Sequence, residues 1–247
     1  MIRQLFKTRR KRILIDISTQ KDLFLASGKA CIGNHRRVLA NIRRVMAWAR
    51  HNSIPVISTC EIYPQNGNGN GNGNGNDNID EHYCIDGTDG QKKIRYTLLD
   101  NRATFPADGN TDLPLDVLRA HRQVILHKRC TDPFDEPRIE RLLSEMKADE
   151  FIIIGATTED AVKAMVLGLL QRGKRVRVVA DAIGSRNKQE AKLALRKMEA
   201  KGAKIIETKK LAGSSGLHRV GICHCDACQR KEKKVQTPAA VQTDSLN

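Results

Sequence analysis

The chain of 247 residues holds 43 Lys and Arg against 28 Asp and Glu, which gives a formal net charge of +15. A chain of this length can bury a core without disulfide support, and we expect one large domain with tails. The surplus of positive charge favours anionic ligands or an anionic polymer as partners. The sequence has neither an apolar run of about 18 residues nor the apolar centre of a signal peptide. We therefore expect a cytoplasmic protein without a membrane partner.

Residues 1–11 form a basic amino-terminal arm, and residues 7–12 read KTRRKR. Such a run is either a solvated arm or a contact for a nucleic acid or another anionic surface, and both interpretations stay open. Aromatic side chains that could stack on bases do not alternate with these charges, which argues against recognition of RNA bases.

A short strand is predicted for residues 12–17 (RILIDI), with Asp16 near its carboxyl end. Apolar residues then repeat at helical spacing over residues 34–50, and residues 53–59 (SIPVIST) predict a second strand. Residues 66–78 (NGNGNGNGNGNDN) cannot bury apolar surface. They predict a loop insertion, which costs little because the entropy of loop closure grows slowly with length.

The pattern is clearest in the centre of the chain, where an apolar run at residues 151–154 ends at Gly155 and leads into a helix. The threonines and acidic residues of the sequence TTED suit the positive end of that helix. A further strand at residues 176–179 completes a right-handed crossover unit. Ligands of open parallel sheets bind beyond the carboxyl ends of the strands, so we expect this turn to border any active site.

The other predicted elements follow the same alternation of strand and helix. Residues 123–127 (QVILH) predict a strand that is followed by Lys128. Two amphipathic helices and an edge strand are predicted for residues 135–147, 188–201 and 203–206.

Residues 155–185 read GATTEDAVKAMVLGLLQRGKRVRVVADAIGS. This stretch resembles the signature of the isochorismatase-like (cysteine hydrolase) superfamily, which has a G-x-x-T-[DE]-x-C-V turn, a long helix ending in R-G, a strand and a D-A stop. The resemblance covers residues 12–207 and implies an isochorismatase-like domain at residues 12–212. It implies a three-layer α/β/α fold with a six-stranded, mainly parallel sheet in the order 3-2-1-4-5-6.

The resemblance also implies where the site lies. Its three anchor positions are Asp16, Lys128 and Ala161, and the amidases of the family carry the nucleophilic cysteine where this chain has Ala161. The turn that would hold an oxyanion contains Gly155, Thr157, Thr158 and Asp160. The residues expected to line the pocket are Phe24, Cys60, Glu61, Tyr63 and Phe134.

Two segments match the family in part. Gln20, Asp22 and Phe24 loosely match a Gln-Asn-Asp-Phe type segment, and residues 81–94 resemble a His-Cys-x-x-Gly-Thr-x-Gly segment. Glu61 and Tyr63 align with the Asp-x-His metal pair of nicotinamidase-like members. Tyrosine beside a single carboxylate is a poor ligand set for a divalent ion, so we expect no catalytic cofactor.

Ala161 rules out covalent amide hydrolysis as in nicotinamidases, because a methyl group cannot attack a carbonyl. Three functions stay open. The first is a non-catalytic relative that binds a small molecule or a partner. The second is a non-covalent hydrolase of the vinyl-ether type that uses Asp16 and Lys128. The third is a hydrolase that recruits Cys60, Cys84 or Cys130. Self-association into a homo-oligomer also stays open.

The tail at residues 213–247 lies outside the resemblance. Its sequence CHCDAC supplies Cys223, Cys225 and Cys228, and His218 or His224 can complete a tetrahedral set for a structural zinc. A redox role and plain surface thiols are the alternatives. The chain has an odd total of seven cysteines without a secretory context, which favours reduced thiols.

The zinc prediction is tested by metal analysis of protein purified without chelator. We expect about one zinc per chain, lost in the Cys223→Ser and Cys228→Ser variants because each removes one ligand of a four-ligand set. Zinc content that neither substitution changes would contradict a site in the tail.

Overall fold

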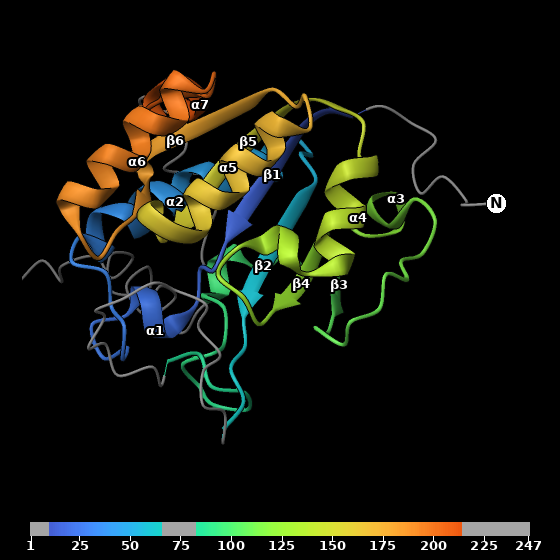
Figure 1. Ribbon diagram of the computed structural model, residues 1–247, viewed down its shortest axis with the longest axis horizontal. Coiled ribbons are helices and arrows are strands. Elements are labelled where there is room, and N and C mark those ends of the chain that lie inside the picture. Colours follow the sequence, from blue (N-terminus) through green and yellow to red (C-terminus); the bar gives the residue numbers. More distant parts are fainter. Residues whose placement is uncertain (1–9, 66–82, 214–247) are drawn as a thin grey trace, which may run out of the picture.

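The computed structural model describes residues 10–65 and 83–213. Its centre is a seven-stranded sheet in the order β3-β4-β2-β1-β5-β6-β7, in which every pair of neighbouring strands is parallel (Figure 1). The strands are β1 (Arg10–Ile17), β2 (Val56–Glu61), β3 (Arg102–Phe105), β4 (Gln123–Lys128), β5 (Ala148–Ala156), β6 (Val176–Gly184) and β7 (Lys204–Ile206).

Helices cover both faces of the sheet, because the two faces are apolar and each buries its own cluster of side chains. One face carries α3 (Val117–Ala120), α4 (Pro137–Glu145), α5 (Lys163–Gln171) and α6 (Lys188–Ala200). The other carries α1 (Lys21–Phe24), α2 (His35–His51) and α7 (Thr208–Ala212). Short helical turns are η1 (Arg95–Thr97), η2 (Pro133–Asp135) and η3 (Thr158–Val162). Within the described ranges no helix is long and apolar enough to cross a membrane.

The predicted three-layer architecture is confirmed, and the six predicted strands occur in the predicted order. The seventh strand, β3, adds an edge next to β4. Its four residues alternate between exposed and half-buried side chains, so it lacks the apolar run by which the other strands were recognised. Strands β1 and β5 also begin earlier than predicted, at Arg10 and Ala148, where these two strands pair.

The close approach of β1 and β5 depends on Gly155. Its φ of +122° is a conformation that side chains rarely adopt, and a Cβ at this position would lie 2.0 Å from the carbonyl oxygen of Ile17. Gly155 is paired with Ile17 in the parallel ladder, one residue beyond Asp16. A larger residue would therefore push the two central strands apart at the edge where Asp16 lies.

We expect Gly155→Ala to lower the free energy of unfolding by about 1–3 kcal/mol more than Gly202→Ala does, because the Cβ overlap adds to the backbone strain. Gly202 is the matched control, since its φ is +104° but a Cβ there would meet nothing within 4 Å. Chemical denaturation of both variants measures the difference. Equal losses of stability would show that the contact with Ile17 is unimportant.

Candidate functional site

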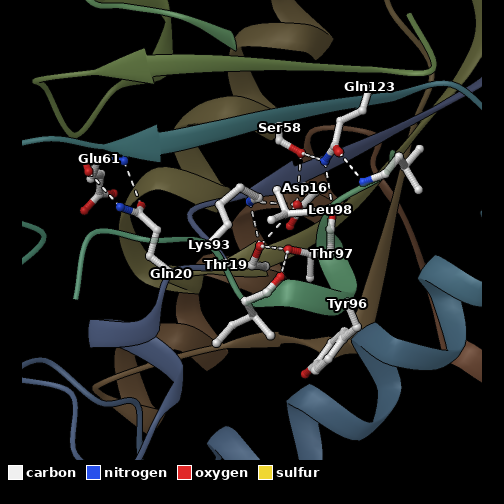
Figure 2. A network of polar contacts seen from close by, with 12 residues as sticks. Asp16, Thr19, Gln20, Ser58, Glu61, Lys93, Tyr96, Thr97, Leu98 and Gln123 are labelled. Atoms are coloured by element: carbon white, nitrogen blue, oxygen red, sulfur yellow. Dashed lines mark hydrogen bonds and ion pairs between the residues drawn. The ribbon is translucent and has the colours of Figure 1, made fainter. Parts of the chain in front are cut away.

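Asp16 lies at the carboxyl end of the central strand β1, between Ser58 of β2 and Ile154 of β5 in the ladder. Its side chain is fully buried. The Oδ2 atom is 2.8 Å from Nζ of Lys93 and accepts a hydrogen bond from Oγ of Ser58 at 3.0 Å. The hydroxyl of Thr19 lies 3.1 Å from the same oxygen (Figure 2). The other oxygen, Oδ1, is buried and has no hydrogen-bond partner among the described residues.

A second layer of side chains holds the partners of Asp16. Gln123 donates from Nε2 to the Ser58 hydroxyl at 2.8 Å, and its Oε1 accepts from the backbone N–H of Leu99 at 2.7 Å. Lys93 also donates to Oγ1 of Thr19 at 2.7 Å, and that hydroxyl lies 3.1 Å from Oγ1 of Thr97 (Figure 2). The Asp16 carboxylate therefore joins four segments of the chain through hydrogen bonds.

Lys128 is also fully buried, but its charge is paired elsewhere. Its Nζ lies 2.9 Å from Oε1 of Glu61 and donates to the carbonyl of Cys130 at 2.7 Å. Glu61 accepts a further hydrogen bond from Ser18 at 3.1 Å. The two anchors that the resemblance places together thus have separate ionic partners, Lys93 for Asp16 and Glu61 for Lys128.

The turn after β5 is held by its own polar side chains. Thr157 donates to Oδ2 of Asp160 at 2.9 Å, and Thr158 donates to the carbonyl of Gly184 at 2.8 Å. Asp160 also pairs with Arg186 at 3.0 Å. The turn has π geometry, and its peptide bond between Ala156 and Thr157 is cis. Thr157 does not cap the turn as predicted, because its side chain makes no capping hydrogen bond to the backbone.

Ala161 lies in this turn and is 1% exposed. Its methyl group belongs to the apolar cluster that also contains Ile17, Met165 and Ile183. The side of Ala161 that faces the core is therefore surrounded by apolar side chains.

The residues expected to line a pocket occupy several different environments. Phe24 is fully buried in the apolar cluster under α2, and Phe134 packs against Gly168 with the Arg172 guanidinium 4.0 Å from its ring centre. Cys60 is buried at the end of β2. Tyr63 stacks edge-to-face on Tyr83 at 5.5 Å.

Glu61 and Tyr63 do not fit the metal site of nicotinamidase-like members. An oxygen of the Glu61 carboxylate is taken by Lys128 and Ser18, and burial raises the pKa of the Tyr63 phenol, so this ring stays protonated and is a poor ligand. In the described part of the chain no three His, Cys, Asp or Glu side chains are grouped to hold a metal ion. The inserted loop at residues 66–78, His82 and the cysteine cluster of the tail lie outside the described residues.

The three thiols considered as substitute nucleophiles are unsuited to that role. Burial raises the pKa of Cys60 to about 11, although Lys93 opposes the shift. Burial also raises the pKa of Cys84, next to Glu61 and Asp22, and that of Cys130. Because only the thiolate is a good nucleophile, these thiols are weakly reactive at neutral pH.

Sequence reasoning missed Lys93, Ser58 and Gln123. Ser58 could have been found, because a buried polar side chain within an otherwise apolar strand needs a hydrogen-bond partner. Nothing in the sequence separates the buried Lys93 from its exposed neighbour Lys92. Gln20 and Asp22, which match the family loop, are buried and bind backbone groups. Gln20 donates to the carbonyl of Glu61 and accepts from its N–H, and Asp22 accepts from the N–H of Cys84.

The family model of the isochorismatase domain matches residues 12–210, and the chain belongs to this family. Among solved structures, pyrazinamidase of Pyrococcus horikoshii in complex with zinc has 20% identity over 80% of this chain and 99% of that chain, with a TM-score of 0.60. An isochorismatase family protein from Desulfovibrio vulgaris has 18% identity over 82% and 97%, with a TM-score of 0.62. A ribonuclease from Caenorhabditis elegans has 19% identity over 97% and 100%, with a TM-score of 0.51. No curated protein matches the sequence. At these identities the likeness establishes the fold.

We expect Lys93→Met to lower the free energy of unfolding by about 3–5 kcal/mol, because it leaves the Asp16 carboxylate buried without a cation. Lys92→Met is the matched control and should change stability little, since Lys92 is exposed and its ion pair with Asp89 is exposed too. In the double variant Asp16→Leu with Lys93→Met, much of the loss should be recovered. A stable Lys93→Met single variant would show that the ion pair is unimportant for the fold.

Proposed function

We propose that this chain is a member of the isochorismatase family that lacks cysteine-dependent amidase activity and acts by binding a ligand or partner without turnover. The observation that carries this proposal is the state of the Asp16 carboxylate. It is fully buried and accepts from Lys93, Ser58 and Thr19 within 3.1 Å. A carboxylate held in this way stabilises the fold, and we infer that this is its role.

The nucleophile position supports the same function. In the amidases that the sequence resembles, a cysteine at the position of Ala161 is deprotonated by the aspartate and attacks the amide carbonyl. The methyl group of Ala161 has no lone pair, and it packs within an apolar cluster. Removal of such a nucleophile leaves only the small residual catalysis of the surrounding groups.

Non-covalent cleavage of a vinyl ether is the alternative, since it does not need a thiol. In that reaction the aspartate protonates the enol-ether carbon, so Asp16 would have to carry and donate a proton. In this structure Asp16 forms an ion pair with Lys93 and acts only as an acceptor. Lys128 would have to assist, but its ammonium is paired with Glu61 and the carbonyl of Cys130. The contacts therefore favour binding over this chemistry.

Turnover assays separate these functions. We expect no hydrolysis of nicotinamide and no cleavage of isochorismate by the wild-type protein. We also expect Ala161→Cys not to restore amide hydrolysis, because Oδ2 of Asp16 is bound by Lys93 and Lys128 is paired with Glu61. Compounds that bind should raise the melting temperature without being consumed.

The controls are Asp16→Asn and Cys60→Ser, each checked for folding by circular dichroism. Turnover by the wild-type protein that Asp16→Asn abolishes would establish a non-covalent hydrolase. Turnover that Cys60→Ser abolishes would establish a recruited thiol. Either result would overturn the proposal.

A further inference from the structure

A groove of about 530 Å³ lies at the amino ends of the strands, at the opposite edge of the sheet from Asp16. Four neighbouring strands contribute to it with residues at or near their amino ends, namely β1, β5, β6 and β7. We call it the amino-end groove. It is lined by Lys11, Arg12, Asp149, Glu150, Leu170, Lys174, Arg175, Val176, Arg177, Gly202 and Lys204.

Positive charge dominates this lining, since six Lys and Arg side chains face two acidic ones. The negative charge of Glu150 is neutralised within the groove, because Glu150 pairs with Arg12 at 3.5 Å and with Arg177 at 2.5 Å. Lys11 and Lys204 are exposed, and within the described part of the chain neither has an ion pair or a side-chain hydrogen bond. The groove therefore keeps a surplus of cations that can bind an anion.

The register of the sheet spreads these cations over neighbouring strands, with Arg177 two residues further along the ladder than Arg12, since Arg177 is opposite Ile152. Arg12 is opposite Glu150 in the ladder of β1 and β5, and Arg177 is opposite Lys204 in the ladder of β6 and β7. Neighbouring strands lie about 4.8 Å apart, so the cations span about 14 Å across the strands from β1 to β7. That width corresponds to about four base-pair rises of about 3.4 Å along a DNA duplex.

We propose that the amino-end groove binds the phosphate backbone of a nucleic-acid duplex. Lysine and arginine are the side chains that neutralise phosphates, and arginine also binds them in a bidentate manner. Binding sites for single strands combine such charges with aromatic rings on which bases stack, and the lining of this groove contains no aromatic residue. Contacts to phosphates alone predict binding that does not depend on base sequence.

This surface is independent of the Asp16 centre. Asp16 lies four positions after Arg12 in β1, which is about 13 Å along an extended strand. The inference goes beyond the proposed function and does not rest on it, so turnover at the Asp16 centre would leave it unchanged.

The test is fluorescence anisotropy of the full chain with a labelled DNA duplex of about two helical turns, titrated at several salt concentrations. The double variant Lys11→Gln with Lys204→Gln removes two cations that have no ion pair or side-chain hydrogen bond among the described residues. We expect weaker binding, and we expect the slope of log K against log salt to become shallower by about 2, one unit for each lost phosphate contact.

The matched control is Lys29→Gln with Lys188→Gln, which removes the same charge from exposed positions outside the groove lining. Thermal melting verifies that both variants fold. A loss of affinity confined to the groove variant, with several unrelated duplex sequences bound equally, would support the proposal. Equal losses in both variants, absence of binding, tighter binding of a single strand of the same length, or binding only to phosphatidylserine vesicles would overturn it.

Discussion

The ion pair between Asp16 and Lys93 is the constraint on which the carboxyl edge of the sheet depends. Both side chains are buried, and removing two charges from water costs several kcal/mol for each ion unless close pairing and hydrogen bonds offset it. The offset is supplied by Ser58 and Thr19, and Gln123 holds Ser58 in place (Figure 2). These groups come from β1, β2, β4 and the segments that follow β1 and precede η1. The polar centre therefore fixes loops that apolar packing alone would leave free.

A second buried pair, Lys128 with Glu61, lies at the ends of β4 and β2, where the two residues are direct ladder partners. Two acids and two cations thus balance one another within one edge of the sheet. Because a buried charge is stable only when it is paired, the presence of Lys93 leaves Lys128 to neutralise Glu61. This pairing explains why Glu61, at the metal position of the resemblance, forms an ion pair with Lys128.

The sequence predicted most of the fold because its strands are short apolar runs with clear stops, and the parallel order follows from the alternation with helices. It missed β3, whose four residues have no apolar run. It also missed Lys93, since the burial of one lysine among neighbours of similar composition is decided by tertiary contacts. For the candidate site the motif positions predict Asp16, Lys128 and Ala161. Motif positions do not determine which ion pairs these side chains form, because that depends on tertiary contacts.

The two edges of the sheet differ in how their charges are balanced, and this difference bears on function. At the carboxyl edge the cations Lys93 and Lys128 are buried and each is matched by an acid. At the amino edge, six cations meet two acids, and Lys11 and Lys204 extend into solvent. A net charge of +15 attracts anions from every direction, but only unpaired, exposed cations exchange their counterions for phosphates. We therefore propose the amino edge, rather than the edge that carries Asp16, as the place where an anionic polymer binds.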